Sequence, residues 1–234
     1  MLIITYMSEK WVTECYNIKK GEDMQITKLE HSGMIVEKDG KKLVFDPVEF
    51  AETLPELHDV AAVIITHIHA DHLQTEKINE ILDLNPNAKV IAPEDVAEVL
   101  PNAILVAGGD EMNVEGFDLK FFGKDHASVL AGKVPCDNIG VVVDDKLMNP
   151  GDSFDLLDLN GAVEVLLVPE VAPWTKISET IEFMKIAKPK VVIPVHDGLL
   201  SKMGKGVYDN LLRGACTEIG AEFAPLGVGE SMDI

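Results

Sequence analysis

The chain has 234 residues, enough for one sizeable domain, and hydrophobic residues make up 47% of it, enough for a proper core. Acidic residues outnumber basic residues by 40 to 20, which gives a formal net charge of −20. A surface of this charge repels phosphate backbones and anionic lipids, so the composition disfavours nucleic-acid-binding and membrane-surface proteins.

Two further features of the sequence bear on where in the cell the protein is found. No apolar run is long enough to span a bilayer, and the first residues lack the basic leader and apolar segment of a signal peptide. The three cysteines, Cys15, Cys136 and Cys216, are far apart and form no C-x-x-C pair. We therefore expect a cytoplasmic protein with reduced thiols and no membrane partner.

Residues 1–23 differ from the rest of the chain. They hold a few scattered aromatic residues and then a polar stretch, and periodic structure begins only at Met24. We expect 1–23 to be an N-terminal lead segment, with Met24 as a candidate for the native start, and 24–234 to form one domain.

Strands dominate the beginning of this domain. Alternating or continuous apolar residues predict them, and Asp39-Gly40 between two of them is a hairpin turn signal. Helical spacing of Ile78, Ile81 and Leu82 then predicts a helix, and Pro93 opens a shorter one. In chain order, the expected elements are strands at 24–30, 33–38, 41–46 and 60–66, a helix at 73–84, a strand at 89–92 and a helix over 93–101.

The second half of the domain repeats this pattern. The expected elements are strands at 103–106, 117–122, 138–143, 146–148 and 163–168, a helix at 176–187, a strand at 190–195 and a helix at 207–219. An α+β fold with two sheets packed face to face and helices outside fits this order. A doubly wound sheet fits less well, because tight hairpins join the first strands.

One short run carries most of the chemistry. Thr66-His67-Ile68-His69-Ala70-Asp71-His72 follows a buried strand and precedes a helix. Three imidazoles and a carboxylate so close together need polar partners, which a divalent cation supplies. Nitrogen and oxygen ligands suit zinc, manganese or iron. Alternation puts His67 and His69 on one side with Asp71 and His72 beside them, which favours two metal ions. The alternative is a solvated histidine-rich loop.

Three later residues also follow predicted strands. His126 comes after the strand at 117–122, Asp152 comes after the strand at 146–148, and His196 ends the strand at 190–195. Each has a simpler interpretation: a surface histidine, a turn or helix N-cap aspartate, and a structural histidine. Their shared placement at strand ends favours a common role with the run at 67–72.

These residues resemble the metallo-β-lactamase superfamily, whose most specific signature is the pattern His67-x-His69-x-Asp71-His72. The resemblance covers 24–234 and implies a metallo-hydrolase domain: an αββα sandwich with the metal ions at one edge between the sheets. It also implies the ligand sets, which are His67, His69 and His126 for one metal ion, Asp71, His72 and His196 for the second, and Asp152 as the bridge.

Two further pieces are similar to the ascorbate-6-phosphate-lactonase-like hydrolases, namely residues 29–33 at the first hairpin and 43–47 after it. By this similarity, His31 is a candidate to contact substrate. Asp46, together with Thr66, is a candidate to brace the run at 67–72. The alternative for His31 is a plain histidine at a strand edge, and the alternative for Asp46 is a turn residue before Pro47.

The combined interpretation is a metal-dependent hydrolase. A bound metal ion lowers the pKa of its water from ~16 towards ~7, and Asp71 is the candidate to orient the nucleophile or accept its proton. We expect two divalent metal ions, zinc or manganese in preference to iron. The expected substrate is a small ester, lactone or phosphorylated metabolite, and a homo-oligomer is compatible with the sequence.

Three other functions remain open. A nuclease of the same superfamily usually adds a clamp domain, for which this chain has little room. A di-iron oxidoreductase on this scaffold tends to carry Glu where His69 stands and to have a flavin partner domain. A non-catalytic metal-binding module normally loses ligands, and here none is missing.

Overall fold

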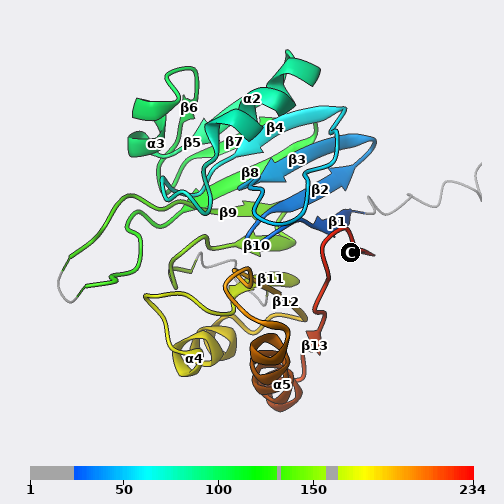
Figure 1. Cartoon of the computed structure of the whole chain (residues 1–234), viewed down its shortest axis with the longest axis vertical. Coiled ribbons are helices and arrows are strands. Elements are labelled where there is room, and N and C mark those ends of the chain that lie inside the picture. The colour runs from blue at the N-terminus through cyan, green and yellow to red at the C-terminus, as the bar shows by residue number, and fades with distance from the viewer. Residues whose placement is uncertain (1–23, 131–132, 157–162) are drawn as a thin grey trace, which may run out of the picture.

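Two seven-stranded mixed sheets lie face to face, and helices cover their outer faces (Figure 1). The structure, a computed structural model, describes residues 24–130, 133–156 and 163–234. The expected lead segment over 1–23 lies outside the described residues. Within them, the αββα sandwich expected from the sequence is confirmed.

The first sheet combines the beginning of the domain with the end of the chain. Hairpins join its first strands in antiparallel fashion, whereas β3 to β6 run parallel. Its last strand, β14, returns to pair antiparallel with β1. The order across the sheet is β14 (Ser231–Asp233), β1 (Gln25–Lys28), β2 (Met34–Lys38), β3 (Lys41–Phe45), β4 (Val60–Ile64), β5 (Lys89–Ala92) and β6 (Ile104–Leu105).

The second sheet has the same mixture of directions. Strands β7 to β10 are antiparallel, and β10 to β13 run parallel. The order across this sheet is β13 (Glu222–Phe223), β12 (Val191–Val195), β11 (Val165–Pro169), β10 (Leu147–Asn149), β9 (Gly140–Val143), β8 (Phe117–Phe122) and β7 (Glu111–Val114). Because β8, β10 and β12 share one direction, their carboxyl ends meet at one edge.

Three apolar layers hold the sandwich together. The central layer fills the space between the sheets, where Phe45, Phe121 and Leu167 are buried. Helices α2 (Thr75–Leu84) and α3 (Glu94–Val99) pack on the first sheet, and α4 (Ile177–Ala187) and α5 (Lys202–Ile219) pack on the second. Each fully buried Phe, Leu or Ile side chain contributes roughly 1.5–3 kcal/mol. This packing fixes the sheet edge that carries the polar residues of interest.

The expected start of the last helix was wrong, and three strands were not expected. The last helix begins at Lys202, not at 207, because the Ser201 hydroxyl caps it by accepting from the Gly204 backbone N–H and the helix continues through Gly206. Strand β7 and the short strands β13 and β14 were not expected. Only one residue of β7, Val114, is buried, so the strand lacks a clear apolar pattern.

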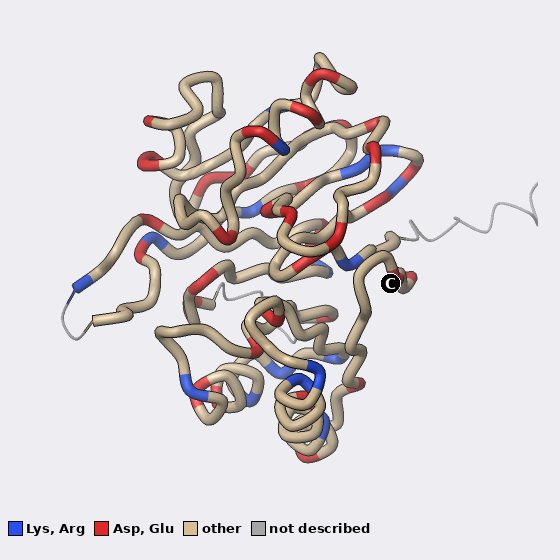
Figure 2. The backbone as a smooth tube through the Cα atoms, viewed as in Figure 1, with Lys and Arg blue, Asp and Glu red and all other residues tan. Residues whose placement is uncertain are grey.

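Acidic residues are spread along the loops and helices over both sheets (Figure 2). Among the described residues, none of the helices combines the length and the apolar composition needed to cross a membrane. Cys136 and Cys216 are free thiols.

Candidate metal centre

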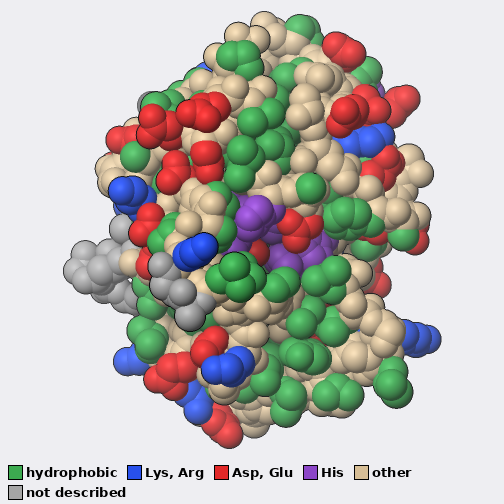
Figure 3. All heavy atoms as spheres, turned by 60° about the vertical axis from the view of Figure 1, so that its left-hand side comes forward, with side chains coloured by type: hydrophobic (Ala, Val, Ile, Leu, Met, Phe, Trp, Pro, Cys, Tyr) green, Lys and Arg blue, Asp and Glu red, His purple; other side chains and the backbone are tan. Residues whose placement is uncertain are grey.

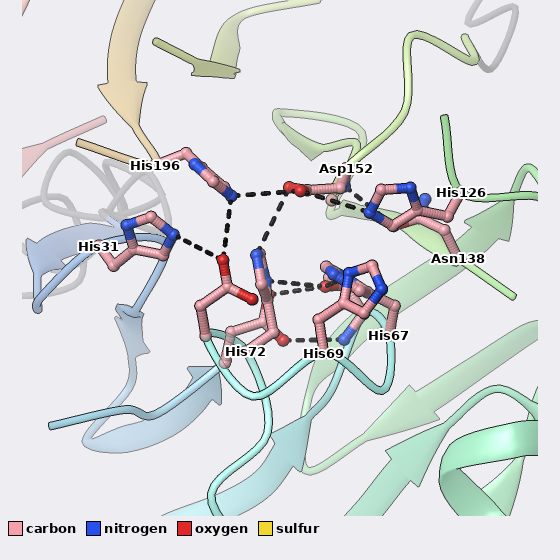
Figure 4. A network of polar contacts seen from close by, with 12 residues as sticks. His31, His67, His69, His72, His126, Asn138, Asp152 and His196 are labelled. Carbon is pink, nitrogen blue, oxygen red and sulfur yellow. Dashed lines mark hydrogen bonds and ion pairs between the residues drawn. The ribbon is translucent and has the colours of Figure 1, made fainter. Parts of the chain in front are cut away.

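All seven predicted metal-binding residues meet at one edge of the sandwich (Figure 4). The run His67–His72 follows β4, whereas His126, Asp152 and His196 follow β8, β10 and β12. The Ile139 backbone N–H donates to the Thr66 carbonyl at 2.9 Å and joins the two sheets at this edge. Side chains far apart in the sequence are therefore neighbours because their strands end at the same place.

The ligand atoms fall into overlapping groups, and within each group they lie within 4.8 Å of one another. This division agrees with the alternation expected along the run at 67–72. The groups are His67, His69 and His126; His67, His72 and Asp152; and His31, Asp71, His72 and His196.

Asp152 occupies the middle of the cluster. Its Oδ1 lies 3.4 Å from His72 Nε2, and its Oδ2 lies 3.5 Å from His126 Nε2 and 3.2 Å from His196 Nε2. The Asn138 side chain accepts a hydrogen bond from the Asp152 backbone N–H at 2.9 Å. Gly151 has a φ of +61°, and a Cβ there would lie 2.4 Å from Asn138 Oδ1. Only glycine therefore allows this close approach.

Several buried atoms at the centre lack hydrogen-bond partners within the described part of the chain. They are Asp152 Oδ1 and the Nε2 atoms of His31, His67, His72, His126 and His196. Buried polar atoms are normally paired, so a group of unpaired atoms facing one point needs an explanation. A donor set of imidazole nitrogens and carboxylate oxygens fits divalent zinc, manganese or iron.

The opposite ring nitrogens are held by fixed acceptors. His126 Nδ1 lies 2.6 Å from the Ala127 carbonyl, and His196 Nδ1 lies 2.6 Å from the Val171 carbonyl. His72 Nδ1 lies 2.8 Å from Asp46 Oδ2. Because a carbonyl or carboxylate oxygen only accepts, each Nδ1 carries a proton. Nε2 is then the atom that each ring offers to a cation.

Asp46 and Thr66 form the support beneath the run at 67–72. Asp46 is fully buried, and its Oδ1 accepts from the Thr66 backbone N–H at 2.8 Å. Its Oδ2 accepts from the Thr66 hydroxyl at 2.7 Å as well as from His72. The Thr66 hydroxyl in turn lies 3.1 Å from His67 Nδ1. One carboxylate thus orients two histidines of the cluster, one of them through Thr66.

The carboxylates and histidines of the centre shift the pKa values of one another. Burial raises the pKa of Asp152, but the neighbouring His72, His126 and His196 outweigh it and hold the pKa well below the ordinary value. Burial lowers the pKa of His72, but Asp152 and Asp46 outweigh it and raise the pKa to about 9. Burial acts to raise the pKa of Asp71 too, yet His31 and the other nearby histidines keep it below the usual range. The centre therefore carries ionised carboxylates at neutral pH.

His31 lies within this centre, beside Asp71, and not at an exposed strand edge. It stands in the turn between β1 and β2 and is buried, and its Nε2 lies 3.3 Å from Asp71 Oδ2. Its ring centroid is 3.9 Å from that of His196. His58 lies away from this centre, with an exposed side chain near Glu56.

Other residues at the centre were not found by reading the sequence. The Trp174 indole N–H donates to Asp152 Oδ2 at 2.7 Å, and Cys136 Sγ lies 3.8 Å from His69 Nε2. Burial raises the pKa of the Cys136 thiol to about 12, so it stays protonated. Neither Trp174, Cys136 nor Asn138 belongs to a motif, and only the fold brings them to the site.

The fold and this cluster define a metal-dependent hydrolase of the metallo-β-lactamase type. Residues 25–196 match the family described as the beta-lactamase superfamily domain, so the chain belongs to the metallo-β-lactamase superfamily.

Three comparisons support this assignment. Protein Rv0786c of Mycobacterium tuberculosis is 31% identical over 79% of this chain and 89% of its own length. A metal-dependent hydrolase of Nanoarchaeum equitans is 29% identical over 90% of this chain and 100% of its own length. The structure of Igni18, a metallo hydrolase from Ignicoccus hospitalis, aligns with a TM-score of 0.69 at 20% identity and covers 91% of this chain and 98% of its own. The last of these shows the shared fold.

Proposed function

We propose that the cluster holds two divalent cations, zinc or manganese in preference to iron. The unpaired, buried Nε2 atoms around Asp152 carry this proposal. In it, His67, His69 and His126 hold the first cation, Asp71, His72 and His196 hold the second, and Asp152 contacts both. Such a pair of cations supplies Lewis-acid activation of water and of the bond to be cleaved.

The protein side chains then provide position and charge. Asp71 is the most exposed carboxylate of the cluster, with a side chain 38% accessible, and it is ionised at neutral pH. We propose that it orients the attacking water and takes its proton. Trp174 and Asn138 keep Asp152 in place by hydrogen bonds to its carboxylate and backbone.

We propose a small ester, lactone or phosphorylated metabolite as the substrate. The histidines gather at one place on the surface, where hydrophobic side chains surround them (Figure 3). Phe50 is an exposed side chain whose ring lies 5.8 Å from that of His31. Such a setting suits a small molecule, and the net charge of −20 opposes a polynucleotide.

Metal removal and return tests this function. We expect the purified protein to contain zinc or manganese by elemental analysis, to lose turnover of small esters, lactones or phosphate esters after chelation, and to regain it when that metal is returned. Full turnover by protein shown to be metal-free would contradict the proposal. Cleavage of RNA or DNA in the same panel would favour the nuclease alternative, and metal binding without turnover of any compound would favour the non-catalytic one.

Metal binding should also release a proton. In the metal-free protein, His72 has a pKa of about 9, so its ring is protonated on both nitrogens at neutral pH. A cation at Nε2 must displace one proton, so affinity should rise with pH, by up to about tenfold per pH unit below pH 9. Calorimetric titration with zinc in buffers of different ionisation enthalpy counts the released protons. A value of zero at neutral pH would contradict this assignment.

A further inference from the structure

The turn that carries His31 is held in place by several contacts. His31 has a φ of +55°, a backbone conformation that residues with a side chain rarely adopt. Its carbonyl accepts from the buried Lys28 ammonium at 2.6 Å and from the His196 backbone N–H at 3.1 Å. Lys28 also lies 3.4 Å from Asp197. A strained conformation fixed from two sides marks a side chain whose position matters.

The ring of His31 carries its proton on the other nitrogen from its neighbours. Its Nδ1 accepts a hydrogen bond from the Gly198 backbone N–H at 3.1 Å. A backbone N–H can only donate, so this Nδ1 has a lone pair and no proton. The Nδ1 atoms of His72, His126 and His196 instead face oxygen acceptors and carry the proton. The neutral His31 ring must therefore carry its proton on Nε2.

Gly198 makes room for this arrangement. A Cβ built at position 198 would lie 3.0 Å from His31 Nδ1, closer than side-chain carbons normally approach a neighbour. Glycine thus lets the backbone come near enough to donate its N–H to the ring. The ring orientation is therefore fixed by the backbone and does not depend on a rotating side chain.

The Nε2 atom of His31 faces the cluster. It is buried, lacks a well-aligned hydrogen bond to any described residue, and lies 3.3 Å from Asp71 Oδ2 (Figure 4). Distance alone would admit His31 as a fourth donor beside Asp71, His72 and His196. A nitrogen that carries a proton, however, has no lone pair for a cation. The protonated Nε2 instead faces Asp71 Oδ2, an acceptor 3.3 Å away.

We infer that His31 binds no cation and is instead a positioning residue whose Nε2–H donates to Asp71. This inference rests on the proposed two-metal function, because it specifies which carboxylate oxygen is left for the second cation. One oxygen of Asp71 is held by His31, and the other is free for the cation and the attacking water. A neutral donor orients the carboxylate without adding a positive charge beside the metal site.

Nuclear magnetic resonance of isotope-labelled imidazole nitrogens tests the ring state directly. In the metal-free protein, we expect His31 to show a protonated Nε2 and an unprotonated Nδ1. After loading with an NMR-active cadmium isotope, ring nitrogens of the proposed ligands should couple to cadmium, namely those of His67, His69, His72, His126 and His196. His31 should show no coupling. Coupling to His31 would overturn the inference and leave the two-metal proposal intact. Absence of cadmium binding altogether would overturn the proposed function, while the tautomer of His31 would still be measured.

Two variants separate a donor from a ligand. In H31Q, the glutamine amide nitrogen replaces the Nε2–H donor but cannot coordinate a cation as imidazole does. In H31N, the shorter amide reaches only the Nδ1 position. We expect both variants to keep the full metal content. H31N should lose about 10–100-fold in kcat, whereas H31Q should restore kcat to within about threefold of the unaltered protein.

His58 provides the matched control, because its side chain is 62% exposed. H58Q should leave metal content and kcat unchanged, which shows that a histidine-to-glutamine change is harmless away from the cluster. Loss of one metal ion from both H31Q and H31N would identify His31 as a ligand. Equal activity in H31N and the unaltered protein would show that the donor has no positioning role.

Discussion

Replacing Asp152 with asparagine is expected to lower kcat/KM by about a thousandfold or more and to reduce the metal content below two ions per chain. The reason lies in the position of this carboxylate, which faces His72, His126 and His196 at 3.2–3.5 Å. It is the only described carboxylate in contact with histidines of both proposed ligand sets. Asparagine keeps the size of the side chain but removes the negative charge that two cations need between them.

Asp155 supplies the control for this change, because it lies three residues further along the same loop with an exposed side chain. D155N should leave turnover and metal content unchanged, while D152N loses both. Elemental analysis and steady-state kinetics, with circular dichroism to verify folding, make the comparison. A folded D152N protein with two metal ions and full activity would exclude the bridging role of Asp152.

Much of the fold and the candidate site could be predicted from the sequence, because the physical signals are local. Buried strands such as Val60–Ile64 appear as short apolar runs, and polar residues directly after them must lie at a sheet edge. His67–His72, His126, Asp152 and His196 all follow this rule. The sandwich could also be predicted from the order of the elements along the chain, because hairpins followed by alternating strands and helices are compatible with few folds.

The remaining features depend on contacts between distant residues. The state of the His31 ring depends on the backbone N–H of Gly198, which lies 167 positions further along the chain. Trp174 reaches Asp152 only because the loop after β11 folds over the end of β10. Lys28 has no sequence signal at all, since a buried lysine cannot be distinguished from a surface lysine until its partners are known.

Replacing Asp46 with asparagine is expected to destabilise the metal-free protein by about 3 kcal/mol and lower its melting temperature by about 6–12 °C. Asp46 is fully buried and accepts hydrogen bonds from the Thr66 backbone N–H, the Thr66 hydroxyl and His72 Nδ1. Asparagine offers one acceptor oxygen and an NH2 group in place of two acceptor oxygens. The NH2 group then either faces another buried donor or forces the His72 ring to give up its proton on Nδ1, and in both cases the negative charge that stabilises protonated His72 is lost.

The same change should alter the chemistry of His72. With an NH2 group opposite Nδ1, the ring is most stable with its proton on Nε2, which blocks the atom proposed to hold the second cation. Affinity for that cation should therefore fall about 10–100-fold.

Asp39 is the matched control, since it is also an aspartate at positive φ but lies exposed in the turn between β2 and β3. D39N should have the same melting temperature and the same zinc affinity as the unaltered protein. Unfolding is measured without metal, because bound metal would stabilise the folded state and mask the effect. Unchanged stability and zinc affinity in D46N would show that Asp46 is only a turn residue.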